Sequence, residues 1–239
     1  MNDKQPAGIL YLVATPIGNY DDITFRALRI LKEADVVVYE DRREGQRLLS
    51  HYGIPEKLME SLNEHNEAAA SFHILEHLKN GRHVAVISDA GTPVFSDPGQ
   101  ILVRKAIDNG IKVTPIPGTS SLLPALTVCG FPIDEFVFHG FLSPKTPRRM
   151  SELRTLRSEH RTMVFMDTPY RLVPLIKDIA EILGAERRAC IAFNLTMEDE
   201  KVFRGTAGEL FRLCEKKELK GEFVIVVEGF KGNSKSRLK

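Results

Sequence analysis

The stretch that decides the fold reads Val86-Ile87-Ser88-Asp89-Ala90-Gly91-Thr92-Pro93-Val94-Phe95-Ser96-Asp97-Pro98. The apolar, β-branched run at 83–87 predicts a buried strand, and the small, polar residues that follow are typical of a loop. In open α/β sheets, ligands bind at the carboxyl ends of the strands. The stretch therefore predicts a strand that delivers a ligand-binding loop.

Two further strands are expected to end in the same way. The apolar run at 10–14 stops at Thr15-Pro16-Ile17-Gly18-Asn19, and the run that ends at Val113 leads into Pro115-Ile116-Pro117-Gly118-Thr119-Ser120-Ser121. If the three strands belong to one sheet, their loops lie at one edge and could line one pocket.

The composition is that of an ordinary globular chain of 239 residues, 43% hydrophobic, with a formal net charge of +1. A nearly neutral chain neither requires nor excludes a nucleic-acid partner, so an argument for RNA depends on local clusters. The 3 cysteines are far apart, without the paired spacing of a zinc site or a disulfide framework. With a polar amino terminus and no long apolar run, these features predict a cytoplasmic protein that does not enter the membrane.

Apolar runs alternate with amphipathic stretches through the first half, which predicts βαβ units and a mainly parallel sheet. Strands are expected at 9–14, 36–39, 83–87 and 112–114, with helices near 22–32, 44–51, 68–79 and 98–109. After a helix at about 120–129 the spacing changes, and strands are expected at 136–141, 162–166, 189–194, 201–205 and 222–228. We therefore expect an α/β protein with domains at 1–117 and 118–230 and a disordered tail at 231–239.

Each of the three loops also has an ordinary explanation. Thr15–Asn19 lacks the Gly-x-Gly-x-x-Gly pattern of a Rossmann loop and could be a plain turn. Asp89 could cap a turn instead of accepting hydrogen bonds from ligand hydroxyls, and Ser120 or Ser121 could simply cap a helix. The interpretation as a site therefore depends on the three loops together.

One short pattern resembles a metal site. His73, Glu76 and His77 match the His-x-x-Glu-His helix of a zinc peptidase. A working zinc site also needs a downstream carboxylate ligand in a deep core, whereas this helix is amphipathic with its charged residues away from the core. We therefore expect no metal.

Basic residues gather in two places. Arg42, Arg43 and Arg47 follow the acidic pair Glu40 and Asp41. A second cluster contains more basic than acidic residues: Lys145, Arg148, Arg149, Arg154, Arg157 and Arg161 against Glu152 and Glu159. Such clusters can neutralise RNA phosphates, although a solvated helix face explains the second one equally well.

Taken together, the loops resemble the tetrapyrrole (corrin/porphyrin) methylase family, and within it the branch that methylates small-subunit ribosomal RNA. The most specific strings are Thr15-Pro16-Ile17-Gly18-Asn19 and Ser88-Asp89-Ala90-Gly91-Thr92-Pro93. Further matches are Glu40-Asp41, Asn63-Glu64-His65-Asn66-Glu67, Pro117-Gly118, Gly140-Phe141-Leu142, Pro169 with Arg171-Leu172, and Gly221-Glu222. The resemblance covers about residues 9–229.

The resemblance implies two α/β domains that bind S-adenosyl-L-methionine in a cleft between them, without a Rossmann glycine loop. By similarity, the cofactor contacts are Pro16, Ile17, Asp89, Thr92, Pro93, Val94, Thr119, Ser120, Ser121, Met166, Asn194 and Leu195.

The same resemblance implies that a homodimer methylates the ribose 2′-hydroxyl of a cytidine in 16S rRNA within the 30S subunit. A ribose hydroxyl is a weak nucleophile, so a nearby base would help, and Glu40, Asp41 and His65 are the candidates. The expected RNA contacts are Asn19, Arg42, Arg43, Lys145, Arg148, Arg149, Tyr170 and Arg171, with Tyr170 stacking on a base.

The chain departs from the branch in three stretches. It has Arg42 where the branch has Thr, Asp167 within Met166-Asp167-Thr168-Pro169 where the branch reads Tyr-Glu-Ser-Pro, and Asn194-Leu195-Thr196-Met197 where it reads Glu-Leu-Thr-Lys. The sequence given also stops soon after Gly229, without the helical extension of many members. Two alternatives therefore stay open: a methylase of a small molecule such as a tetrapyrrole, and a non-catalytic relative that binds cofactor or RNA.

Overall fold

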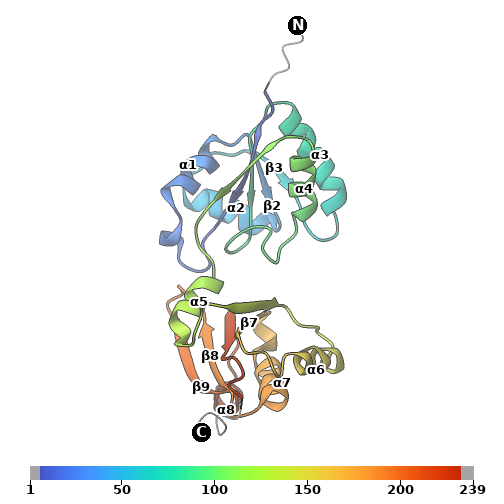
Figure 1. Cartoon of the computed structure of the whole chain (residues 1–239). Helices are drawn as coiled ribbons and strands as arrows, with labels where there is room; N and C mark the ends of the chain where they lie inside the picture. The colour runs from blue at the N-terminus through green and yellow to red at the C-terminus, as the bar shows by residue number, and fades with distance from the viewer. Residues whose placement is uncertain (1–5, 233–239) are drawn as a thin grey trace. The chain divides into compact units, whose positions relative to one another are not determined.

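The computed structural model describes residues 6–232. It divides into two compact units, Met1–Ser120 and Ser121–Lys239, here called the N-terminal and C-terminal units. Each has its own five-stranded sheet and helices, so the predicted two-domain α/β class is confirmed (Figure 1). The tail expected to be disordered lies outside the described residues from 233 onward. Within the described part, no helix combines the length and apolar character that a membrane span requires.

The sheet of the N-terminal unit is parallel throughout, as the alternation of the sequence predicts. Its strands are β1 (Ile9–Val13), β2 (Val36–Tyr39), β3 (Leu58–Ser61), β4 (Val84–Ile87) and β5 (Lys112–Ile116), in the order β3-β2-β4-β1-β5. β1 pairs with β4 and β5, so the carboxyl ends of these three strands lie side by side. The edge strand β3 is missing from the sequence prediction.

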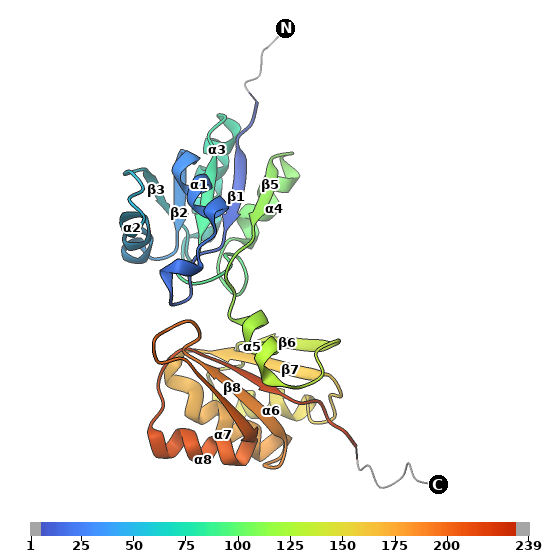
Figure 2. The ribbon, with the colours of Figure 1, turned by 90° about the vertical axis from the view of Figure 1, so that its left-hand side faces the viewer.

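Helices cover both faces of this sheet. α1 (Phe25–Glu33) and α2 (Arg42–His51) pack on one face, and α3 (Glu67–Lys79) and α4 (Gln100–Asp108) pack on the other (Figures 1 and 2). A short 3₁₀ turn, η1 (Tyr20–Asp22), precedes α1. The side chains of Thr24 and Asp41 accept hydrogen bonds from the first backbone N–H groups of α1 and α2, which fixes where those helices begin.

The sheet of the C-terminal unit is mostly antiparallel. It contains β6 (Phe136–Gly140), β7 (Thr162–Asp167), β8 (Arg188–Phe193), β9 (Lys201–Thr206) and β10 (Phe223–Val227), in the order β6-β7-β10-β8-β9. Only β6 and β7 pair in parallel. The helices are α5 (Leu122–Cys129), α6 (Thr146–Thr155), α7 (Leu172–Leu183) and α8 (Ala207–Lys217), with the 3₁₀ turn η2 (Pro169–Arg171) before α7.

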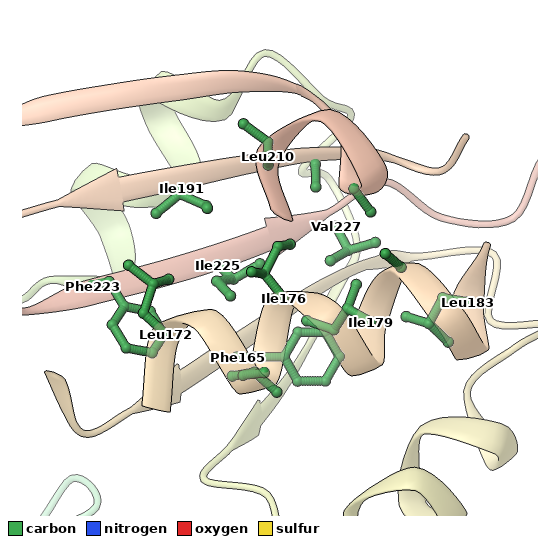
Figure 3. Packing of buried hydrophobic residues seen from close by; sticks show 14 of the residues in the cluster. Phe165, Leu172, Ile176, Ile179, Leu183, Ile191, Leu210, Phe223, Ile225 and Val227 are labelled. Atoms are coloured by element: carbon green, nitrogen blue, oxygen red, sulfur yellow. The ribbon is translucent and has the colours of Figure 1, made fainter. Parts of the chain in front are cut away.

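The core of the C-terminal unit lies between α7, α8 and one face of the sheet (Figure 3). Leu172, Ile176 and Ile179 of α7 point toward Phe165 of β7 and Ile225 of β10, and all of these side chains are fully buried. α5 contacts β8 and β10. The loops that leave these strands are therefore attached to a sheet that packs against a buried core.

Candidate functional site

The three loops predicted to form a site are bonded to one another at the carboxyl edge of the N-terminal sheet. Thr15, after β1, exchanges two backbone hydrogen bonds with Gly91, after β4, at 2.9 and 3.0 Å. The Thr15 hydroxyl donates to the carbonyl oxygen of Ser88 at 2.9 Å. Thr119, after β5, donates its hydroxyl to the carbonyl oxygen of Thr15, and Thr92 donates to that of Thr119 at 3.1 Å. The loops therefore form one bonded assembly.

Two glycines permit this close approach. Gly91 has φ of 88°, a left-handed conformation that a residue with a Cβ rarely adopts. A Cβ on Gly118 would lie 2.9 Å from the Cβ of Ala14, closer than two carbon atoms pack. The backbone itself thus forms part of the surface of these loops.

The loop from Ser88 to Gly99 has a strained backbone. Val94 and Ser96 have φ of 71° and 67°, and a β-branched residue in this region is a genuine outlier. Such strain persists only where the surrounding structure fixes it, and it is found mostly at functional sites. The Ser88 hydroxyl donates to Asp97 at 2.6 Å and accepts from the backbone N–H of Ala90 at 3.3 Å, which holds the two ends of the loop together.

Glu67 supports the same loop from α3. Its carboxylate accepts hydrogen bonds from the backbone N–H groups of Gly99 and Ile101 at 2.8 and 3.0 Å, at the start of α4. Neither Glu67 nor Asp97 is among the site residues inferred from the sequence. Glu67 stands in a matched string and Asp97 stands in the stretch Val86 to Pro98, but the sequence could not show their contacts, because these join residues that are distant in the chain.

Carboxylates gather beside these loops. Glu40 is the first residue after β2. Burial of its carboxyl raises the pKa to about 7, and the negative charges of Asp97 and Asp89 add to the rise. Burial also raises the pKa values of Asp89 and Asp97. Asp89 accepts a hydrogen bond from the backbone N–H of Asp41 at 3.1 Å. This concentration of negative charge suits a cationic ligand and disfavours a phosphate.

The three residues expected to act as a base have different surroundings. Glu40 is half-buried within the carboxylate group. The Asp41 carboxylate accepts from the backbone N–H groups of Arg43 and Glu44, so it serves as the cap of α2. His65 is exposed, 3.5 Å from Glu64, whose charge also acts on Glu40.

The remaining expected cofactor contacts belong to loops of either unit. Pro16, Ile17 and Pro93 are buried or half-buried in the N-terminal loops, whereas Ser121 begins α5 in the C-terminal unit. Met166 lies in β7. Asn194 and the buried Leu195 follow β8.

Asn194 is held firmly where β8 ends. Its φ is 47°, its backbone N–H donates to the carbonyl oxygen of Glu222, and its side-chain amide donates to Asp199 at 3.0 and 2.8 Å. The Asn194 side-chain oxygen is buried without a hydrogen-bond partner. The backbone and the amide nitrogen of Asn194 are thus fixed by hydrogen bonds, whereas its side-chain oxygen is not.

Two of the residues expected to contact RNA form ion pairs and hydrogen bonds within the C-terminal unit. Arg149 is 4% exposed and pairs with the buried Asp178 at 2.7 Å. Arg171 pairs with Asp167 at 2.9 Å and donates to the carbonyl oxygens of Leu142 and Ser143. Because the guanidinium of Arg149 is enclosed by protein, it is not accessible to an RNA phosphate.

The other expected RNA contacts are accessible or near the surface. Arg42 and Arg43 lie exposed on the first turn of α2. Lys145 and Arg148 are exposed at the start of α6, and Arg148 also pairs with Glu152 at 3.1 Å. The Tyr170 side chain is 73% exposed. The Asn19 side chain caps η1.

The pattern that resembles a zinc peptidase lines a separate hollow. His73, Glu76 and His77 of α3 surround a cavity of about 710 Å³ together with Glu60, Asn80 and Arg82. His77 lies 3.4 Å from Glu60 and 3.2 Å from Arg82. Among residues 6–232, no group of three or more His, Cys, Asp or Glu side chains could hold a metal ion.

Comparison with known proteins now defines the family. The model of the Tetrapyrrole (Corrin/Porphyrin) Methylases matches residues 9–210. The chain belongs to the tetrapyrrole methylase family. This confirms the resemblance seen in the sequence, and with it the enzyme class: the chain is a methyltransferase that uses S-adenosyl-L-methionine.

Within the tetrapyrrole methylases, the chain is similar to curated proteins named ribosomal RNA small subunit methyltransferase I. It is 42% identical to the one from Pseudomonas aeruginosa over 94% of this chain and 80% of that protein. It is 43% identical to the one from Thermotoga maritima over 93% of this chain and 99% of that protein.

Solved structures of other tetrapyrrole methylases share the fold. A cobalt precorrin-4 methyltransferase superposes with a TM-score of 0.67 at 19% identity, covering 92% of this chain and 94% of that chain. A uroporphyrin-III C-methyltransferase from Thermus thermophilus, complexed with S-adenosylhomocysteine, gives 0.63 at 19% identity, covering 92% and 97%. At these identities, the likeness concerns the fold alone.

Proposed function

We propose that this methyltransferase transfers a methyl group from S-adenosyl-L-methionine to the ribose 2′-hydroxyl of a cytidine in 16S rRNA. The observation that carries the proposal is the identity of 40 to 43% with small-subunit ribosomal RNA methyltransferases over nearly the whole chain. The solved tetrapyrrole-modifying enzymes are 19% identical to this chain, so they support the small-molecule alternative by the shared fold and not by sequence.

The bonded loops of the N-terminal unit suit the cofactor. S-adenosylmethionine supplies a methyl group on a positively charged sulfur. The carboxylates of Asp89 and Asp97 provide a matching negative environment, and the close-packed glycines leave backbone groups available to a ligand. The proposed contacts here are Pro16, Ile17, Asp89, Thr92, Pro93, Val94, Thr119 and Ser120. Ser121, Met166, Asn194 and Leu195 remain proposed contacts from the C-terminal unit.

Glu40 is the best-suited base for the ribose hydroxyl. A general base works best when its pKa is near the working pH, and the pKa of Glu40 is about 7. Asp41 is engaged as a helix cap, and His65 is solvent-exposed. In this proposal Glu40 takes the proton from the 2′-hydroxyl while the surrounding loops hold the hydroxyl in line with the methyl group, and such alignment can lower the barrier by several kcal/mol.

RNA phosphates need a positive surface away from these carboxylates. Arg42, Arg43, Lys145 and Arg148 are the exposed candidates, and Tyr170 is an exposed aromatic on which a base could stack. The homodimer and the cytoplasmic location implied by the resemblance are part of the same proposal. Size-exclusion chromatography with light scattering tests the dimer.

The decisive experiment uses 30S subunits that lack the modification. Purified enzyme and radiolabelled S-adenosylmethionine should produce 2′-O-methylcytidine in 16S rRNA, detected by nuclease digestion and mass spectrometry. The absence of this nucleoside, while calorimetry shows that the cofactor binds, would contradict the proposal and favour a different acceptor or a non-catalytic role.

A further inference from the structure

We propose that an unpaired RNA segment binds along one edge of the C-terminal sheet, with bases stacked on Phe141 and Tyr170 and a phosphate contacted by Lys220. These three residues are called the aromatic edge below. The inference rests on the proposed function and deepens it, because it specifies both the surface and the single-stranded form of the RNA.

The sheet topology brings the three residues to one edge. Phe141 follows β6, Tyr170 lies in η2 just after β7, and Lys220 precedes β10. β6, β7 and β10 are neighbours in the sheet. β6 and β7 run in parallel while β10 is antiparallel to β7, so the end of β6, the end of β7 and the start of β10 coincide. The three residues therefore leave adjacent strands at the same end of the sheet.

Both aromatic side chains face solvent. The exposed fraction is 50% for Phe141 and 73% for Tyr170, although each is large enough to favour burial. The next residue in the chain after Phe141, Leu142, is 7% exposed and belongs to the core. The loop is therefore anchored by its neighbour while Phe141 is held outward.

The buried Arg149 and the partly buried Arg171 hold this loop in place. Arg171 donates to the carbonyl oxygens of Leu142 and Ser143 at 3.1 and 2.8 Å. Arg149 donates to those of Ser143 and Pro144 at 3.4 and 3.2 Å. A surface that is already rigid loses little entropy when a ligand binds. Arg149 and Arg171, which the sequence suggested as RNA contacts, thus fix the loop on which a base is proposed to stack.

Basic side chains lie against Tyr170 and at the end of the loop that contains Phe141. The Lys220 ammonium lies 4.1 Å from the centroid of the Tyr170 ring, and Lys145 and Arg148 are exposed at the start of α6. Of the acidic groups on these segments, Glu152 pairs with Arg148, and burial raises the pKa of Glu222. Aromatic rings interleaved with cations are typical of surfaces that bind single strands, since only unstacked bases present their faces.

The test measures binding of the full-length protein to a fluorescent 10-nucleotide RNA by anisotropy, and to the duplex made from the same sequence. Phe141→Ala and Tyr170→Ala should each weaken single-strand binding by at least about five-fold, as loss of one base stack does elsewhere. Lys220→Ala should reduce the salt dependence of binding. Phe25→Ala is the matched control, because Phe25 is an exposed aromatic, 93% accessible, in the N-terminal unit.

The outcomes separate this inference from the proposed function. In one outcome, the wild type methylates 30S subunits, and the double variant Phe141→Ala/Tyr170→Ala keeps the wild-type affinity for RNA and the wild-type KM for 30S subunits. The inference about the aromatic edge is then overturned, and the proposed function stands. If the variants lose single-strand binding but the wild type methylates no rRNA, only the proposed function fails. Equal or tighter wild-type binding to the duplex overturns the inference. A third result would also overturn the inference: the variants bind protein-free 16S rRNA as tightly as the wild type does but no longer bind intact subunits. The aromatic edge would then contact a ribosomal protein.

Discussion

At the scale of single residues, Glu40 is the proposed base, and its carboxyl has a raised pKa. The carboxylate must be ionised to accept a proton, so kcat/KM should rise with pH and level off above about 7, the pKa of Glu40. Glu40→Gln should lower kcat by about 10²- to 10⁴-fold and abolish this rise. A pH profile of both proteins on 30S subunits checks this, and an unchanged profile in the variant would assign the base to another group.

Replacing Glu40 by glutamine should lower activity but raise stability at high pH. Folding raises the pKa of Glu40 from 4.5 to about 7, so the neutral form is favoured in the folded protein. Its contribution to stability is fully present below pH 4.5 and is lost as the pH rises through about 7. Glu40→Gln should therefore unfold at higher denaturant concentration than the wild type at pH 8, and the gain should disappear at pH 4. Equal midpoints at pH 8 would contradict the burial of this charge.

Glu67 tests the support of the strained loop. Glu67→Ala removes the acceptor of two backbone N–H groups at the start of α4, which should cost about 1 to 2 kcal/mol of stability and raise the Kd for S-adenosylmethionine. Glu67→Gln retains an acceptor oxygen and should lose less of both. Thermal unfolding and calorimetry measure the two effects, and cofactor affinity that is unchanged in Glu67→Ala would show that this contact does not shape the site.

At the scale of elements, the ion pair between Arg149 on α6 and Asp178 on α7 should dominate local stability. Asp178→Ala leaves a buried guanidinium without its partner and should cost about 3 to 5 kcal/mol. The control is Glu152→Ala, which breaks the exposed pair with Arg148 and should cost no more than about 1 kcal/mol. Urea denaturation compares the two, and similar losses would mean that burial does not distinguish these pairs.

The elements also show what the sequence could predict. Strands such as β2 and β4, in which every residue is buried, were predicted because continuous β-branched runs have few alternatives. β3 was missed because its residues Leu-Met-Glu-Ser are half-exposed at the sheet edge and show neither alternation nor a continuous apolar run. The burial of Arg149 could not be predicted, because its partner Asp178 lies 29 positions away and its neighbours on α6 form an exposed basic cluster.

At the scale of the whole molecule, each unit has its own core, so a core substitution should act first on its own unit. Ile176→Ala leaves a cavity in the fully buried cluster of the C-terminal unit and should cost about 2 to 5 kcal/mol. Hydrogen exchange should show the loss of amide protection mainly in residues 121–232. Equal loss throughout the chain would indicate a single cooperative unit.

The sequence predicted the two-domain α/β class and the assembly of three loops, because alternating elements and turn residues follow local rules. It did not predict that the second sheet is mostly antiparallel, since strand direction there depends on long-range pairing such as that of β10 between β7 and β8. Nor could it reveal that Glu67 and Asp97 fix the loop, because those contacts are set by tertiary structure.

The order of strands in the N-terminal sheet also bears on how the protein avoids aggregation. β5 and β3 are its two edges, and an open edge can pair with the edge of another molecule. β5 contains Pro115, which has no backbone N–H to offer an incoming strand, and β3 is short and directly preceded by Lys57. Both edges therefore carry features that oppose intermolecular sheet formation, which should help the chain to remain dispersed at the high concentrations reached during overexpression.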